Sequence, residues 1–83
     1  MAEKVPMIAL SPTMDKGTVA RWRRKVGDAV KAGDVLCEVE TDKATMDYES
    51  SVEGTLLAIV VPEGGQAAVG DTIAIVGAPG EDI

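Results

Sequence analysis

A single lysine is the residue of this chain best placed to take part in a reaction, and it would need another enzyme to modify it first. Lys43 is the only basic residue after Lys31. Residues 1–31 hold seven Lys and Arg against three Asp and Glu, whereas residues 32–83 hold one against eleven. Because surrounding carboxylates favour the charged amine, Lys43 would be a poor nucleophile by itself. Chemistry at Lys43 therefore requires another enzyme to modify its side chain.

The rest of the composition excludes most other kinds of active site. The 83 residues suffice for one domain with a small core, which leaves little room for a deep catalytic cleft. There is no histidine, so the commonest general base and the commonest metal ligand are both absent. The single cysteine excludes an internal disulfide and a cysteine-rich zinc site. We therefore predict no catalytic residue, no metal site and a non-catalytic role.

Charge and hydropathy narrow the range of partners. A net charge of −6 argues against nucleic acid, whose binding requires a basic surface. No run of 18 apolar residues is present, and the N-terminal residues lack the pattern of a signal peptide, so no membrane association is expected. We expect a soluble, monomeric domain in a reducing compartment, with the cytosol as the first expectation.

The apolar residues favour an all-β domain. Eleven Val and five Ile, with many Gly and Pro to form turns, are typical of strands. The predicted strands cover residues 4–10, 18–23, 29–31, 35–41, 44–49, 55–61, 66–68 and 72–76. In the second strand Val19 and Trp22 are both expected to seek the core although they are three residues apart, which predicts a bulge.

Lys43 lies at the corner of a predicted hairpin between residues 35–41 and 44–49. Both segments alternate between apolar and polar residues, as half-buried strands do. The side chains expected to face inward are Cys37, Val39, Ala44, Met46 and Tyr48. The connection Thr41-Asp42-Lys43-Ala44 has no glycine to adopt a positive φ, so we predict a type I turn.

The chain repeats itself at an offset of 37 residues. The shift aligns Gly17 with Gly54 and Gly33-Asp34 with Gly70-Asp71 without a gap, and apolar positions follow. Two copies that bury a shared core imply approximate internal two-fold symmetry. The same shift takes Lys43 to Pro6 and to Gly80, near the two ends of the chain. We therefore expect Lys43 at one end of the domain and both chain ends at the other.

These residues resemble a lipoyl domain. The resemblance rests on Glu38-Val39-Glu40-Thr41-Asp42-Lys43-Ala44 and on the Gly-Asp turns that flank it, and it covers essentially the whole chain. The run Ala9-Leu10-Ser11-Pro12-Thr13-Met14 is similar to the start of such a domain in the dihydrolipoyl acetyltransferase of pyruvate dehydrogenase complexes. The resemblance implies a flattened β-sandwich of two four-stranded antiparallel sheets with quasi-two-fold symmetry.

The resemblance also implies a function. Lys43 would carry covalently attached lipoic acid, with Asp42 and Ala44 as recognition neighbours, and the loop of residues 11–17 would lie near the lysine hairpin and help a decarboxylase to recognise the domain. As a swinging-arm carrier, the domain would shuttle acyl groups and reducing equivalents between active sites of a 2-oxo acid dehydrogenase complex, for which pyruvate is the expected substrate. The implied partners are a thiamin-dependent 2-oxo acid decarboxylase, the acyltransferase core, dihydrolipoyl dehydrogenase and a lipoate ligase or lipoyl/octanoyl transferase.

Two other functions stay open. Biotin carrier domains share the fold, but they typically place methionine on both sides of the lysine, where this chain has Asp42 and Ala44. An unmodified β-sandwich interaction module is the second alternative. We expect the lipoyl domain to span residues 1–77 and an interdomain linker to begin at residues 78–83.

Overall fold

The computed structural model describes residues 2–80, which form eight strands and no helix. The strands are β1 (Glu3–Pro6), β2 (Lys16–Trp22), β3 (Ala29–Val30), β4 (Val35–Glu40), β5 (Thr45–Glu49), β6 (Gly54–Ile59), β7 (Gln66–Ala68) and β8 (Thr72–Gly77). No described residue belongs to a helix that could cross a membrane. Each strand overlaps a predicted strand.

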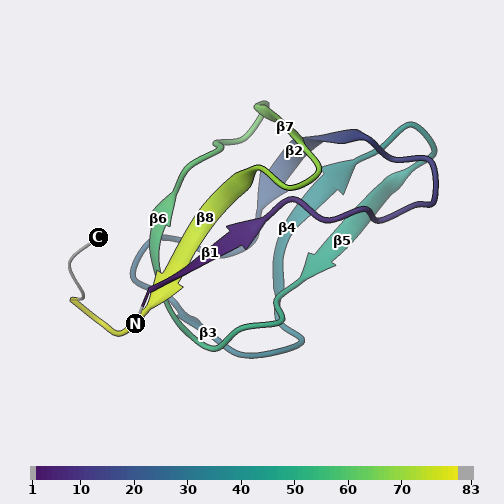
Figure 1. Ribbon diagram of the computed structural model, residues 1–83. Coiled ribbons are helices and arrows are strands. Elements are labelled where there is room, and N and C mark those ends of the chain that lie inside the picture. The colour runs from purple at the N-terminus through teal and green to yellow at the C-terminus, as the bar shows by residue number, and fades with distance from the viewer. Residues whose placement is uncertain (1, 81–83) are drawn as a thin grey trace.

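The strands form two four-stranded antiparallel sheets that face each other across one core (Figure 1). One sheet has the order β1-β8-β6-β3 and the other the order β5-β4-β2-β7. The sandwich is elongated, with extents of 37 × 20 × 20 Å. The predicted fold class, an all-β flattened sandwich, is therefore confirmed.

The two sheets repeat each other strand for strand. The 37-residue shift carries β2 onto β6, β3 onto β7 and β4 onto β8, and the two sheet orders then coincide, with β5 in the place of β1. The register of β2 on β4 shifts between Val19 and Arg21, as the predicted bulge requires. The register of β6 on β8 shifts at the equivalent place, between Leu56 and Ala58. The quasi-two-fold symmetry thus extends to the irregularities of the strands.

The first strand is shorter than predicted. It ends at Pro6 rather than at Leu10, and its register on β8 shifts at Pro6, which has no amide N–H for the ladder. Met7 still lies in the core with 1% of its surface exposed. Its amide donates to the Asp71 carbonyl, and its own carbonyl accepts from the Gly70 amide, so Met7 pairs with a turn instead of a strand.

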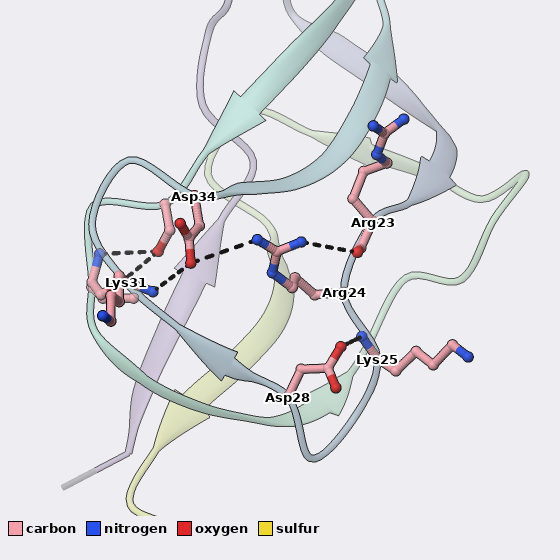
Figure 2. Close-up of polar contacts among 8 residues, drawn as sticks. Arg23, Arg24, Lys25, Asp28, Lys31 and Asp34 are labelled. Carbon is pink, nitrogen blue, oxygen red and sulfur yellow. Dashed lines mark hydrogen bonds and ion pairs between the residues drawn. The ribbon is translucent and has the colours of Figure 1, made fainter.

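Three of the tight turns share one sequence-encoded construction. In residues 25–28, 31–34 and 68–71, a glycine with positive φ precedes an aspartate whose carboxylate accepts the amide of the first residue. Figure 2 shows two of these bonds, from Lys25 to Asp28 and from Lys31 to Asp34. The fourth equivalent turn starts with Pro62, which has no N–H, and it ends in Gly65 instead of aspartate. The carboxylate is therefore present only where a backbone donor needs an acceptor.

The β4–β5 hairpin and the described chain ends lie at opposite ends of the long axis (Figure 1). The prediction from the repeat is confirmed in this respect. Of the predicted linker, residues 81–83 lie outside the described residues, as does Met1 of the predicted domain.

Candidate functional site

Thr41 builds the turn that presents Lys43. Its hydroxyl oxygen accepts hydrogen bonds from the amides of Lys43 and Ala44, both at 3.1 Å, and the hydroxyl lies 2.9 Å from the Ala44 carbonyl, to which it donates. The Thr41 amide also donates to the Ala44 carbonyl. No residue other than glycine has positive φ anywhere in residues 2–80, so the turn is not of a mirror-image type. The Thr41 side chain therefore closes this hairpin without a glycine.

The hairpin extends beyond the core of the sandwich. Ala44 is exposed and Met46 keeps 38% of its surface accessible, so the prediction that these two side chains face inward is wrong. Alternation defines the face of a strand on which a side chain lies, but not whether the opposite sheet reaches far enough to cover it. Farther along the same face, Tyr48 is 4% exposed, as predicted. Lys43 thus stands at the tip of a projection.

The Lys43 side chain is exposed and unpaired. Its amine makes no ion pair and no hydrogen bond with any other residue in the described range 2–80. The neighbouring Asp42 carboxylate points to the loop between β1 and β2, where it accepts hydrogen bonds from Thr13 Oγ1 at 3.0 Å and from Ser11 Oγ at 3.5 Å. Because the Asp42 carboxylate binds this loop, it does not pair with the Lys43 amine, which stays accessible.

The loop of residues 7–15 is fixed beside the hairpin by two methionines. Met7 and Met14 are 1% and 7% exposed, and the Leu10 amide lies 3.2 Å from the Met14 sulfur. Gly17 allows this close approach, because a Cβ there would lie 2.7 Å from both Met14 Cε and Val39 Cγ1. The resemblance implied that residues 11–17 lie near the lysine hairpin, and the bonds from Ser11 and Thr13 to Asp42 confirm this proximity.

A surface recess of about 180 Å³ separates the hairpin from the start of β2. Its polar lining includes Asp15, Lys16, Glu40, Asp42 and Gln66. Acidic side chains continue along β5, where Asp47 and Glu49 are exposed. Lys43 therefore projects from a predominantly acidic end of the molecule.

Below the hairpin, β4 and β5 are anchored by buried side chains that do not take part in exposed chemistry. Cys37 and Val39 are completely buried, as predicted. Burial raises the pKa of the Cys37 thiol to about 12, so the reactive thiolate is disfavoured. The Tyr48 hydroxyl donates to the Pro6 carbonyl and so ties β5 to the end of β1. These residues join the base of the hairpin to the core and to the first strand.

Sequence reasoning identified the hairpin and Lys43, but missed two side chains that organise them. The roles of Thr41 and Thr13 depend on hydrogen bonds that no spacing rule indicates, although a Ser or Thr at the start of a turn is a known signal for side-chain closure. Within the described residues, no group of His, Cys, Asp and Glu is arranged to hold a metal ion. The arrangement suits covalent attachment at an exposed amine.

Comparisons with known proteins agree with this arrangement. A family model described as "Biotin-requiring enzyme" matches residues 3–76. Over its whole length, the chain is 54% identical to the dihydrolipoyllysine-residue acetyltransferase component of the pyruvate dehydrogenase complex from Zymomonas mobilis, and 51% identical to that from Rhizobium meliloti. The mitochondrial pyruvate dehydrogenase complex protein X component of Chaetomium thermophilum is 51% identical over 99% of the chain. The chain spans 19% of the length of each of these relatives.

A solved structure of similar size has the same fold. The lipoyl domain of the 2-oxoglutarate dehydrogenase complex from Azotobacter vinelandii superimposes with a TM-score of 0.67 at 30% sequence identity. The match covers 96% of this chain and 99% of that domain.

Proposed function

The chain belongs to the family of biotin- and lipoyl-attachment domains, and within it to the lipoyl domains, and on this premise we propose that Lys43 is the attachment site of lipoic acid. The observation that carries the proposal is the exposed, unpaired Lys43 amine at the tip of a hairpin that projects from the core. An amide bond to that nitrogen would remove its positive charge without breaking any contact among the described residues. The residues present therefore fit the group.

The protein chain would hold the lipoyl group in an accessible position, and the lipoyl group would supply the reactive atoms. When bound, the lipoyl group supplies a dithiolane that accepts an acyl group together with two electrons. Thr41 would fix the direction in which the Lys43 side chain leaves the hairpin, through its bonds to the two following amides. We propose Asp42 and Ala44 as the recognition neighbours, since both are exposed on either side of the lysine.

The acidic hairpin end supports a role in steering. Glu40 and Asp42 immediately precede Lys43, Asp47 and Glu49 follow along β5, and all four are exposed. Such a surface would direct the domain to active sites with basic entrances and raise the rate of encounter without requiring a long-lived complex. On a flexible tether, the arm would be present at an effective concentration on the order of millimolar at each site.

We propose further that the domain is a non-catalytic swinging-arm carrier within the acetyltransferase chain of a pyruvate dehydrogenase complex. The full-length similarity to the corresponding segment of the Zymomonas and Rhizobium proteins supports this assignment. The proposed partners are the thiamin-dependent decarboxylase, the acyltransferase core, dihydrolipoyl dehydrogenase, and a lipoate ligase or lipoyl/octanoyl transferase. Bacterial and mitochondrial relatives support the bacterial cytoplasm or, alternatively, the mitochondrial matrix as the compartment.

The domain boundary is also part of the proposal. We assign residues 1–77 to the lipoyl domain and the residues from 78 onward to the start of a linker. The end of β8 at Gly77 and the end of the family match at residue 76 support this boundary.

Intact-mass spectrometry after incubation with lipoate, ATP and a lipoate ligase tests the attachment site. We expect the mass of one lipoyl group to be added to the unaltered chain and none to Lys43→Ala. Lys31→Ala, which also removes a turn lysine, is the matched control and should still gain one group. Absence of added mass, or its persistence in Lys43→Ala, would refute the assignment. A parallel incubation with biotin and a biotin ligase, followed by streptavidin binding, distinguishes a biotin carrier.

A further inference from the structure

A groove on the side of the sandwich offers an interaction surface separate from the Lys43 hairpin. Its volume is about 330 Å³, and its lining includes the apolar side chains of Trp22, Val26, Ile59 and Pro62. Trp22 pairs with Cys37 at one end of β2, whereas Thr18 at the other end pairs with Glu40 next to the lysine hairpin. A partner bound in the groove would therefore leave the hairpin free.

The groove lies where the two halves of the repeat meet, and its two walls differ in charge. The 37-residue shift relates Trp22 to Ile59 and Lys25 to Pro62, so equivalent segments face each other across it. One wall carries Arg24 and Lys25, and the equivalent positions of the other wall hold Val61 and Pro62. The two walls are thus related by the repeat in the backbone, but only one of them carries these two cations.

The floor of the groove is preorganised. The Trp22 indole N–H donates to the Val61 carbonyl at 2.8 Å, and the Trp22 amide donates to the Glu63 carboxylate at 3.1 Å. The first bond fixes the orientation of the ring before any partner arrives, which lowers the entropic cost of binding. The second engages the only acidic side chain of the lining, Glu63, with the protein's own backbone.

The basic wall retains capacity for an external carboxylate. The Lys25 amine makes no ion pair or hydrogen bond within residues 2–80, since Asp28 binds the Lys25 backbone amide instead. Figure 2 shows the Lys25 side chain extending away from Asp28 and from Arg24. The Arg24 guanidinium has only a 3.7 Å contact with Asp34 and a 3.2 Å bond to the Arg23 carbonyl. In a chain of net charge −6, these cations form a local site of opposite sign.

The apolar floor also ends in an unusually exposed side chain. Val26 keeps 58% of its surface accessible, at the tip of the turn that borders the groove. An apolar side chain inserted between Trp22 and Val26 would bury this surface, and burial of apolar area favours binding.

From these features we propose that the groove is a docking site for an acidic peptide segment that contains an aliphatic or aromatic side chain. The apolar side chain enters the groove against Trp22 and Ile59, and its flanking carboxylates pair with Lys25 and Arg24. The site provides a second point of attachment for a partner protein and operates independently of any modification of Lys43.

Titration with a capped peptide, Asp-Glu-Leu-Phe-Glu-Asp, tests this surface. Because Trp22 is the only tryptophan in the chain, its fluorescence reports directly on the groove. We expect a saturable change in Trp22 emission that weakens as salt is added, since salt screens exposed charge pairs. A peptide with lysine in place of every acidic residue, and one with serine in place of leucine and phenylalanine, should each bind at least about tenfold more weakly.

The turns of the fold supply matched control variants. Lys25→Glu should weaken binding about tenfold or more, whereas Lys31→Glu, at the same position of an equivalent turn, should change it less than about twofold. Val26→Asp should likewise weaken binding, and Val69→Asp, in the other Val-Gly-Asp turn, should not. All four side chains are exposed, so the variants are expected to remain folded.

Several outcomes would overturn the proposal. These are an absence of saturable change at millimolar peptide, equal binding of the lysine-containing peptide, or equal losses in Lys25→Glu and Lys31→Glu. Tighter binding of a thymidine oligonucleotide than of the acidic peptide would reassign the groove to nucleic acid. Lys43→Ala should bind the peptide unchanged, so failure of the groove and failure of lipoylation are observed separately.

Discussion

The β4–β5 pair and the β8–β1 pair occupy equivalent edges of the two sheets and differ in what joins them. Both pairs are antiparallel, and both shift register at the same place. The strand partners skip Leu36 in β4 and its repeat equivalent, Ile73, in β8. A turn closed by Thr41 connects β4 to β5, whereas β8 and β1 are the last and first strands of the chain. The scaffold is therefore duplicated, and the exposed lysine occurs only where the two halves differ.

This comparison separates the residues that build the domain from those that give it a function. Residues related by the repeat should contribute similarly to stability wherever both are buried. Substitution of residues without an equivalent should change stability little, or should change the structure at only one end of the molecule. Three predictions test this division.

The largest effect is expected in the shared core. Leu36 and Ile73 are related by the repeat, and both are 0% exposed. Leu36→Ala and Ile73→Ala should each lower the free energy of unfolding by about 2–5 kcal/mol, because each leaves a cavity in the core. Chemical denaturation measures both, with the half-exposed Val60→Ala as a control that should change little. A loss confined to one of the two variants would show that the halves do not share the core equally.

An intermediate effect on stability is expected at Gly17 and Gly54, which the repeat relates but whose surroundings differ. Gly54 has φ of +152°, and a Cβ there would lie 2.7 Å from the Gly77 carbonyl oxygen, a backbone atom. At Gly17 the added Cβ meets side chains instead, among them the flexible end of Met14. Gly54→Ala should therefore destabilise by about 1–3 kcal/mol and Gly17→Ala by less.

The Gly17 variant has a second, local readout. Displacement of Met14 should loosen the loop of residues 7–15 and weaken the bond from Thr13 to Asp42, which changes the NMR signals of the lysine hairpin. Gly54→Ala should leave those signals unchanged. The reverse order of stabilities, or equal changes at the hairpin, would contradict the contacts described here.

The smallest effect is expected in alkaline solution, where Cys37 differs from its counterpart Ala74. Burial raises the pKa of Cys37 from 9.0 to about 12. In the unfolded chain the thiol loses its proton near pH 9, so above that pH the unfolded state binds fewer protons than the folded state. Stability should therefore fall as pH rises from 9 to 12, by about 1 kcal/mol at pH 10. Burial, and then the charge of Cys37, also raises the pKa of Tyr48 to about 12, which acts in the same direction above pH 10.

Cys37→Ala makes the two halves alike at this position and isolates the thiol's contribution. Its free energy of unfolding should be lower than that of the unaltered chain at pH 7, because a buried side chain is truncated. Between pH 9 and pH 10, however, it should decline less. Denaturation at several pH values provides the measurement, and parallel declines in the two proteins would show that Cys37 does not contribute.

Much of the fold could be predicted because it depends on local patterns and on their repetition. β-favouring composition and turn residues placed all eight strands, alternation supported the two strands of the lysine hairpin, and the spacing of Val19 and Trp22 identified a bulge that occurs in both halves. The prediction failed at the end of β1 and at Met46. Pairing of Met7 with the Asp71 turn, and the distance to which the opposite sheet extends, are set by segments remote in sequence.

The sequence by itself determined the two-fold scaffold and the position of a lone lysine at the end of the domain away from the chain ends. Turn chemistry, strand alternation and charge are encoded in neighbouring residues, so no coordinates were needed to find them. The tertiary structure decided that Asp42 binds Thr13 rather than Lys43, and that Trp22 and Lys25 border an open groove. Both outcomes depend on which remote surfaces meet when the sheets pack, because a side chain's partner is fixed by distance in space and not by distance along the chain.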